Sequence, residues 1–273
     1  MVSHKEKISL TEEQETLLVP LYCKAVEGQR AHPILVDEKS QEIIELIDYD
    51  FSQLKIPYGT RVTLCLRAKK LDAYAREFIA AHPGSLVLHL GCGLDSRYSR
   101  VKNKDVEWYD LDMPAVIDLR KKFFQETDTY HMIPSSVTDF NWMTAISPPA
   151  RPVLVIAEGL LMYLREEEVK ALILKLREVF PGCRLAFDAY SVLTARRVKA
   201  HPSIKKTGAT VQWGIDDASA IEAWGAGIRL QEEWYFTQAE DISKLGPGIR
   251  LMFKLAGLFA AARRAHRVLY YTL

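Results

Sequence analysis

Apolar positions change their spacing along the chain near residue 85. Before that point they recur at helical intervals, and they predict one helix beginning near Thr11 and others over about 38–47 and 60–81. The run His82-Pro83-Gly84 ends the third of these helices. We therefore expect an N-terminal helical cap over residues 1–84.

From Leu86 onward, short apolar runs alternate with helical patterns. Helices are expected at Pro114–Gln125 and Glu166–Val179. This alternation predicts a doubly wound, mostly parallel α/β sheet, with a core over residues 85–189. The expected strands are Leu86–Leu90, Val106–Leu111, His131–Pro134, Val153–Ala157 and Arg184–Asp188.

The later part of the chain adds two elements to this sheet. Residues 190–226 follow neither pattern, and we expect a helical insertion or lid there. Residues 229–236 and 267–272 predict two more strands, with a basic helix over Ile249–Arg264 between them. The last strand is expected to insert antiparallel or to pair at an edge. Residues 227–273 would then complete a single domain spanning 1–273 with a seven-stranded sheet.

Composition narrows the class of protein. The 273 residues are 48% hydrophobic, enough for a sizeable core. Lys and Arg number 36 against 35 Asp and Glu, so the overall charge of +1 gives no case for nucleic acid or an anionic membrane as a partner. The first fifteen residues lack the apolar core of a signal peptide, and the four cysteines form no metal-ligand pair. We expect a soluble, cytoplasmic protein without a metal, either a monomer or a homodimer.

The stretch Leu86–Arg97, LVLHLGCGLDSR, carries the first chemical signal. Gly91 and Gly93 directly follow the apolar run, where glycine lets the backbone turn tightly and approach a ligand. Asp112 ends the next apolar run about 20 residues later. A glycine turn followed by a strand-end carboxylate is typical of a nucleoside cofactor site.

Two residues of this turn argue against a dinucleotide. Ser96 stands where the dinucleotide fingerprint needs its third small residue, and Asp95 stands at the position of the pyrophosphate. A carboxylate there would repel phosphate. A sulfonium cofactor with an amino acid tail has no phosphate and is positive near its sulfur. The residues therefore favour S-adenosylmethionine over NAD.

Five segments together resemble the leucine carboxyl methyltransferase and tetracenomycin-type polyketide O-methyltransferase family. They occur in the family's order through about residue 190, and AEGLLMYL brings the chain nearest to the bacterial small-molecule branch. The resemblance implies a Rossmann-like class I methyltransferase that uses S-adenosylmethionine, releases S-adenosylhomocysteine and needs no metal. The segments are TLLVPLYCKAVE (16–27), LRAKKLDAYAREFI (66–79), LVLHLGCGLDSR (86–97), WYDLDMPAVIDLRKKFF (108–124) and LVIAEGLLMYL (154–164).

The resemblance also implies roles for single residues. Arg67 would bind the cofactor carboxylate, with Lys24 near a basic position that can share this task. Asp112 would accept both ribose hydroxyls, and Glu158 would lie near the methionyl amino group and the reaction centre. The turn residues Gly91, Cys92 and Gly93 would line the amino acid portion of the cofactor.

One position departs from the family pattern. Members commonly carry Asp-Leu after the third strand, where it contacts adenine, and this chain has Ser136-Val137. Ser136 could still make one hydrogen bond to the base.

Structural roles compete with these assignments. Asp112 could cap the helix at Pro114. Arg67 could be an exposed residue paired with Asp72, and Lys24 could be a solvated lysine. His89 is expected to be a hydrogen-bonded strand histidine, and Asp95 could pair with Arg97 to fix the turn.

The catalytic candidates on the acceptor side are Glu158, Tyr163 and Asp188. Asp188 closes the fifth strand at the sheet edge where ligands bind, and Tyr163 could either face the substrate or fill the core. His131 is a further candidate base, so the sequence offers no unambiguous one. A carboxylate acceptor is already ionised at neutral pH and needs none, which favours carboxylate methylation.

Three functions remain open. The leading one is O-methylation of a small molecule, either a carboxylate or a hydroxyl of a polyketide-like or aromatic metabolite. The others are methylation of a protein C-terminal carboxylate and S-adenosylmethionine binding without catalysis. Trp213 and Trp224 in the expected lid suit an apolar acceptor, although they could equally be core.

Overall fold

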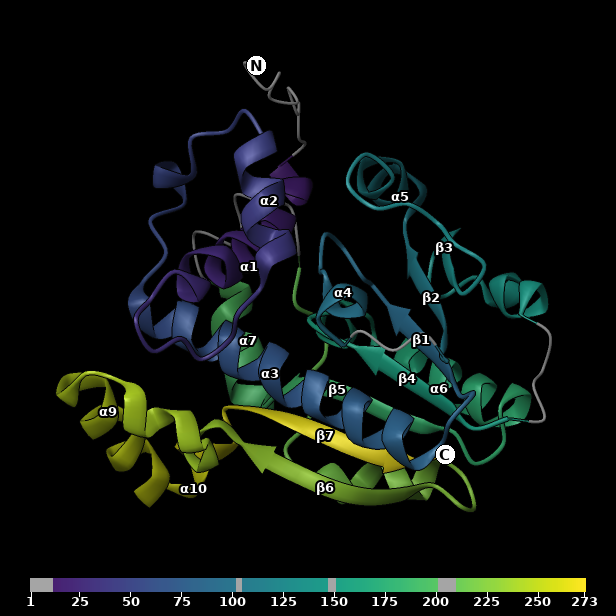
Figure 1. Cartoon of the computed structure of the whole chain (residues 1–273). Helices are drawn as coiled ribbons and strands as arrows, with labels where there is room; N and C mark the ends of the chain where they lie inside the picture. Colours follow the sequence, from purple (N-terminus) through teal and green to yellow (C-terminus); the bar gives the residue numbers. More distant parts are fainter. Residues whose placement is uncertain (1–11, 102–104, 147–150, 201–209) are drawn as a thin grey trace, which may run out of the picture.

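A seven-stranded sheet runs through the middle of the protein (Figure 1). The computed structural model describes residues 12–101, 105–146, 151–200 and 210–273. The strand order is β3-β2-β1-β4-β5-β7-β6, and β7 is antiparallel to both of its neighbours while β1 to β5 pair in parallel. The strands are β1 (Leu86–Leu90), β2 (Glu107–Asp112), β3 (Tyr130–Pro134), β4 (Val153–Ala157), β5 (Arg184–Tyr190), β6 (Arg229–Tyr235) and β7 (His266–Thr272). All seven strands lie where the apolar runs predict them.

Two hydrophobic layers cover the sheet because successive side chains of a strand point to opposite faces. In β1, Val87 packs on one face, while Leu86 and Leu88 pack on the other. The first face is covered by α1 (Glu12–Gly28), α2 (Glu38–Leu46), α3 (Tyr58–Ala81), α4 (Arg97–Val101) and α5 (Pro114–Arg120). The second is covered by α6 (Glu166–Val179) together with the 3-10 turns Phe140–Ala145 and Ala218–Trp224. Strands buried on both faces need continuous apolar runs, which is why the sequence pattern located them.

Two predicted helices end differently in the structure. The helix expected over Pro114–Gln125 stops at Arg120, because the chain then turns to bury Phe123 and Phe124. The Phe124 ring lies over the Arg120 guanidinium, with 3.9 Å from Cζ to the ring centroid. The basic helix expected over 249–264 is two helices, α9 (Pro247–Leu258) and α10 (Ala260–Arg264), separated by an extended Phe259. Gly257, a poor helix former, precedes this break.

The segment expected to be a lid packs against the sheet in its described parts. It contains α7 (Val192–Ala200) and the turn Ala218–Trp224, while residues 201–209 lie outside the described ranges. The backbone amides of residues 212 and 213 donate to the Met162 carbonyl, and the amide of residue 215 donates to the Tyr190 carbonyl. These hydrogen bonds fix residues 212–215 against the segments that follow β4 and end β5. Trp213 is buried in the second hydrophobic layer, and Trp224 packs on it. These tryptophans are therefore core residues.

A fully buried carboxylate, Asp110 in β2, ties the sheet to its first covering layer. It accepts hydrogen bonds from the side chains of Arg120 in α5, Tyr130 in β3 and His89 in β1. Arg120 also donates to the Gly93 carbonyl at 2.9 Å. Burial alone would raise the pKa of Asp110, but the Arg120 charge and these hydrogen bonds outweigh it and lower the pKa to about 2. His89 is the hydrogen-bonded strand histidine that the sequence predicts.

Asp110→Asn tests this buried ion pair. Removing the carboxylate leaves Arg120 buried without its counter-ion, so the free energy of unfolding at pH 7 should fall by about 3–5 kcal/mol. Wild-type Asp110 has a lower pKa in the folded than in the unfolded chain, so its contribution is present above pH 4 and disappears as the pH falls from about 4 to 2. Urea unfolding of both proteins across this range measures both effects.

The matched control is Asp118→Asn, which neutralises an exposed aspartate of α5, the helix that carries Arg120. It should change the unfolding free energy by no more than about 0.5 kcal/mol. Parallel pH curves for wild type and Asp110→Asn would show that Asp110 does not carry this acid sensitivity.

Candidate functional site

A cavity of about 320 Å³ opens at the carboxyl ends of β1 and β4. The turn after β1 and the turn after β4 form two of its sides, and side chains of α1 and α3 complete the wall. In an open α/β sheet, ligands bind at this edge of the strands. Nine of the residues singled out in the sequence line the cavity: Lys24, Arg67, His89, Gly91, Cys92, Gly93, Asp95, Glu158 and Tyr163.

The glycine turn is held in a left-handed conformation and packed from behind. Gly91 has φ 64° and Gly93 has φ 52°, and the Gly91 amide donates to the Leu111 carbonyl at 2.8 Å. A Cβ on Gly91 would lie 2.9 Å from Leu160 Cδ1, on the turn after β4. Backbone conformation and the Leu160 side chain therefore both require glycine at 91, before any ligand is considered.

Asp112 braces the same turn from the end of β2. Its Oδ2 accepts the Gly93 amide at 2.7 Å and its Oδ1 accepts the Met113 amide at 2.8 Å. Helix α5 has Met113 as its N-cap, so Asp112 is not the cap that the sequence left open. Each carboxylate oxygen retains a lone pair for a further donor. Asp112 does not itself line the cavity, but the glycine it holds does.

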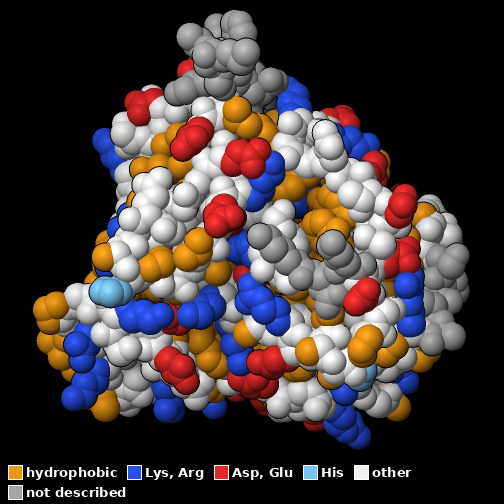
Figure 2. Space-filling model, in the orientation of Figure 1, with side chains coloured by type: hydrophobic (Ala, Val, Ile, Leu, Met, Phe, Trp, Pro, Cys, Tyr) orange, Lys and Arg blue, Asp and Glu red, His pale blue; other side chains and the backbone are white. Residues whose placement is uncertain are grey.

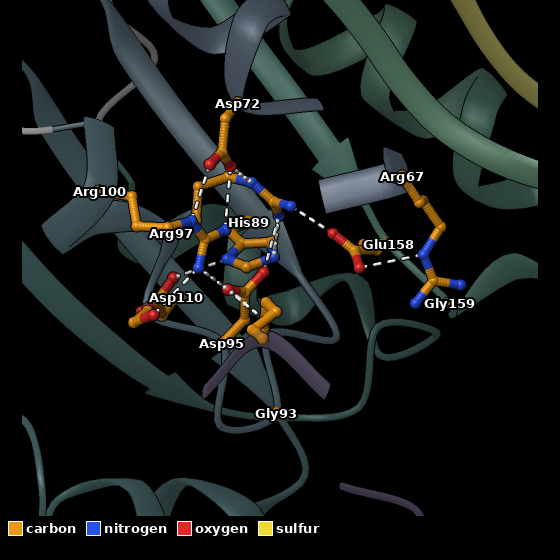
Figure 3. Close-up of polar contacts among 12 residues, drawn as sticks. Arg67, Asp72, His89, Gly93, Asp95, Arg97, Arg100, Asp110, Glu158 and Gly159 are labelled. Carbon is orange, nitrogen blue, oxygen red and sulfur yellow. Dashed lines mark hydrogen bonds and ion pairs between the residues drawn. The ribbon is translucent and has the colours of Figure 1, made fainter. Parts of the chain in front are cut away.

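Arg67 and Lys24 are both buried. The alternatives of an exposed Arg67 and a solvated Lys24, which the sequence left open, are therefore excluded. Arg67 donates from Nε to Glu158 Oε1 at 3.0 Å and from Nη1 to Asp188 Oδ2 at 2.9 Å, so it is not an exposed partner of Asp72. Lys24 is 2% exposed, and its Nζ lies 2.8 Å from Asp95 Oδ1. Figure 3 shows Arg67 and Glu158 turned toward each other.

Behind the cavity wall, Arg97 forms ion pairs with carboxylates from three parts of the chain (Figure 3). Its guanidinium contacts Asp72 at 2.8 Å, Asp95 at 3.2 Å and Glu158. The expected pairing of Asp95 with Arg97 is confirmed. Arg100, one turn further along α4, contacts Asp95 and Asp72, each at 2.7 Å.

These cations keep the lining carboxylates ionised. Burial would raise the pKa of Glu158, but Arg67 and Arg97 together bring that pKa below its ordinary value. Burial acts the same way on Asp95, and Arg100, Arg97 and Lys24 outweigh it, so the pKa of Asp95 lies well below its usual range. The charged side chains that line the cavity at its glycine end are therefore two cations, Lys24 and Arg67, and two carboxylates.

This balance corrects one step of the sequence argument. Asp95 is in contact with Lys24, Arg97 and Arg100, so its charge is largely offset. Its repulsion of a phosphate is weaker than an isolated carboxylate would give. A neutral site with both signs instead suits a zwitterion, such as an amino acid end with its ammonium and carboxylate.

Asp188 lies behind Arg67 rather than in the cavity wall. It is fully buried and accepts hydrogen bonds from the Gly159 amide at 2.6 Å and from His266 Nε2 at 2.7 Å. Burial would raise the pKa of Asp188, but Arg67 and His266 lower it far below the ordinary value. A carboxylate with so low a pKa is a weak base, so this geometry suits the positioning of Arg67.

His266 is a partner that the sequence reasoning missed. It is the first residue of β7 and pairs across the sheet with Tyr190. Its only sequence signal is its place directly before the last apolar run, and the antiparallel insertion of that strand is what brings it to Asp188.

Aromatic and aliphatic side chains make up much of the remaining cavity lining. Tyr163 and Met162 follow β4, Tyr190 ends β5, and Leu21 and Leu64 come from α1 and α3. Burial raises the pKa of Tyr163, and it raises the pKa of Tyr190 to about 12. Both phenols are therefore neutral at pH 7. The sequence reasoning identified Tyr163 and missed the others, since their helical or strand-end positions carry no motif.

Besides Asp112 and Asp188, three further sequence candidates lie outside the cavity lining. The Ser136 hydroxyl is 2.8 Å from the Thr138 hydroxyl, and Val137 is buried in the second hydrophobic layer. His131 is half-buried, with Nε2 3.8 Å from Glu107 Oε1. The role of Ser136 and Val137 beside adenine stays a prediction.

Comparison with known proteins places the chain in a family. The family model of leucine carboxyl methyltransferase matches residues 23–177. The tetracenomycin polyketide synthesis O-methyltransferase TcmP of Streptomyces glaucescens is 39% identical, over 98% of this chain and 99% of its own length. The S-adenosyl-L-methionine-dependent methyltransferase dpfgK of Gibberella zeae is 28% identical, over 89% of this chain and 88% of its own length.

Solved structures share the fold at low sequence identity. A DUF574 family protein from Streptomyces avermitilis has a TM-score of 0.59 at 13% identity, covering 96% of this chain and 98% of its own. The magnesium protoporphyrin IX methyltransferase of Synechocystis with bound SAM has a TM-score of 0.50 at 13% identity, covering 87% and 97%. The expected Rossmann-like methyltransferase fold is thus confirmed, and the matched residues include the glycine turn, Arg67, Asp112 and Glu158. The chain belongs to the leucine carboxyl methyltransferase family.

Proposed function

We propose that this chain is an S-adenosylmethionine-dependent O-methyltransferase that acts on a small molecule. The proposal rests on the cavity described above, in a chain that belongs to this methyltransferase family. Two buried cations and two buried carboxylates line the cavity beside the glycine turn, together with apolar side chains. The charged end suits the zwitterionic methionyl part of the cofactor, and the apolar wall suits an acceptor with hydrophobic surface.

Arg67 is the residue best placed to take the cofactor carboxylate. Its Nε and Nη1 are occupied by Glu158 and Asp188, and among the described residues its Nη2 has no hydrogen-bond partner. Nη2 lies beside Gly159, where a Cβ would approach to 3.4 Å. Glu158, ionised and also in the lining, would attract the ammonium group.

Asp112 would hold the ribose. Its two oxygens each have one backbone donor, which fixes the carboxylate and leaves one acceptor site on each for two neighbouring hydroxyls. When bound, the cofactor supplies a methyl group that its sulfonium already activates. The chain's own part is then to align the acceptor and exclude water.

The acceptor group that the cavity favours is a carboxylate. Tyr163 and Tyr190 are neutral at pH 7, Asp188 lies outside the lining, and His89 is committed to Asp110 and Arg97. None of these is poised to remove a proton from an alcohol. A carboxylate acceptor is ionised without help, so binding and alignment suffice.

Asp112→Ala should weaken S-adenosylmethionine binding by about 100-fold or more, since it removes two hydrogen bonds to a charged acceptor, each worth about 1.5 kcal/mol or more. Isothermal calorimetry measures the change. Asp118→Ala, an exposed aspartate of the neighbouring helix, is the control and should bind like wild type. Unchanged affinity in Asp112→Ala would refute the ribose assignment.

Arg67→Met should raise the dissociation constant of S-adenosylhomocysteine by about tenfold or more, since it deletes a charge-assisted contact and leaves Glu158 without one cation. The same change should hardly affect 5′-methylthioadenosine, which lacks the amino acid carboxylate. Arg229→Met, at an exposed position of β6, serves as control. An equal loss for both ligands would mean that Arg67 supports the fold rather than the carboxylate.

A transfer assay with methyl-labelled cofactor tests the acceptor. Aromatic carboxylic acids, phenols and peptide C-termini are offered in parallel, and we expect label in base-labile esters of the aromatic acids. Base-stable product would identify a hydroxyl acceptor, and labelling of peptides alone would identify a protein carboxyl methyltransferase. Cofactor binding without transfer to any class would favour a binding protein without catalysis.

A further inference from the structure

Exposed apolar side chains gather on one short segment at the end of the molecule where α9 and α10 lie (Figures 1 and 2). Eight large hydrophobic side chains are exposed among the described residues, and five of them fall between residues 251 and 259. Leu258 is 70% exposed and Phe259 is 65% exposed. Isolated exposed hydrophobics need no explanation, but such a concentration marks an interaction surface.

The apolar residues of α9 point in two directions. Phe253 is buried against the first hydrophobic layer and anchors the helix. Leu251, Leu255 and Leu258 follow one another at intervals of four and three residues, so they form a stripe along one side of the helix, and all three are exposed. The stripe therefore faces largely away from the core, although Leu251 also lines a groove between α9 and residues 237–243.

Cationic side chains occur on both helices of this segment. Arg250 and Lys254 lie one turn apart on α9, next to the stripe, while Arg263 and Arg264 end α10, where Arg263 lies over the Tyr235 ring. Residues 247–264 contain no acidic side chain. Of the acidic residues on the preceding turn, Asp241 is held by Lys69 and Lys244, and Glu240 lies with Arg250 and Lys254 in a groove on the inner side of α9.

We propose that α9 and α10 dock this protein on an anionic phospholipid surface. A helix with an exposed apolar stripe and flanking cations lies in the membrane interface, with its apolar side chains among the acyl chains and its cations at the headgroups. This is attachment and not insertion, since no helix in the described ranges is long and apolar enough to cross a bilayer. The overall charge of +1 gives no sign of this basic surface, because its four cations lie within eighteen residues and are balanced by acidic residues elsewhere in the chain.

A second copy of the chain fits the surface less well. In a two-fold pair the same patch forms both sides of the interface, and residues 247–264 supply cations but no carboxylate to pair with them. Like charges brought together in this way oppose association, whereas anionic headgroups attract all four.

The docked surface would lie next to the cavity wall. A Cβ on Gly59, at the start of α3, would lie 3.9 Å from Met252 Cε, and the next residue, Thr60, lines the cavity. Apolar acceptors that partition into the bilayer would then meet the protein beside its site. The docking itself does not rest on methyl transfer, and its test needs no enzyme activity.

Vesicle co-sedimentation tests the proposal. The full chain is mixed with vesicles of phosphatidylcholine alone or of phosphatidylcholine with phosphatidylglycerol, and we expect sedimentation with the anionic vesicles that weakens as salt is added. L258E places a charge in the stripe and should lower the apparent affinity by about tenfold or more. R250Q/K254Q should lower it by a similar factor, since each cation near the surface contributes about fivefold.

M113E is the matched control, because Met113 is 53% exposed and follows β2, in the opposite half of the sheet from β6 and β7. It should bind vesicles like wild type. Thermal unfolding of all variants confirms that they are folded. Failure of wild type to sediment with anionic vesicles, or full binding by L258E, would overturn the proposal. So would a dimer in light scattering that L258E dissociates without any vesicle binding, because the surface would then join two copies of the chain.

Discussion

The buried guanidinium of Arg97 is the interaction on which the site depends. A charge without water must have counter-ions, and removing one of them is costly. Arg97 takes its counter-ions from α3 through Asp72, from the turn after β1 through Asp95 and from the end of β4 through Glu158. This one side chain thereby fixes α3 and the ends of β1 and β4, which together border the cavity, relative to one another.

The same pairing sets the electrostatics of the cavity. Each lining carboxylate is matched by at least one cation, so the glycine end of the site is strongly polar but close to neutral overall. The ion pairs offset part of the free energy that it costs to bury these charges away from water. Behind the lining, Asp188 accepts a hydrogen bond from Arg67 and another from His266, which fixes one edge of the Arg67 guanidinium.

Local sequence pattern predicted the sheet and much of the site, because both depend on short-range properties. Buried parallel strands need apolar runs, and the turn after β1 needs residues that tolerate left-handed φ, so β1, Gly91 and Gly93 were visible. Asp112 was visible because it ends a strand at the same edge.

What the sequence did not reveal depends on pairing between distant segments. His266 reaches Asp188 only through the antiparallel insertion of β7, and Trp213 is core only because its backbone is held at Met162. The end of α5 at Arg120 depends on the packing of Phe124 against that residue's guanidinium. The outward direction of the stripe on α9 similarly depends on which side of the helix carries the anchoring Phe253.

The place of β7 in the sheet has a consequence for the order of assembly. The strand made last from the described chain lies between β5 and β6, and the backbone of Leu273 is hydrogen-bonded to residues 182 and 183. During synthesis, β5 therefore presents an open edge and β6 lacks its partner until residues 266–273 leave the ribosome. The paired residues of β5 and β7 lie 76 to 88 positions apart in sequence, and such non-local pairing is slow to form and leaves strands unpaired meanwhile. The sheet, and with it the support that His266 gives to Asp188, is thus complete only after residues 266–273 have emerged from the ribosome.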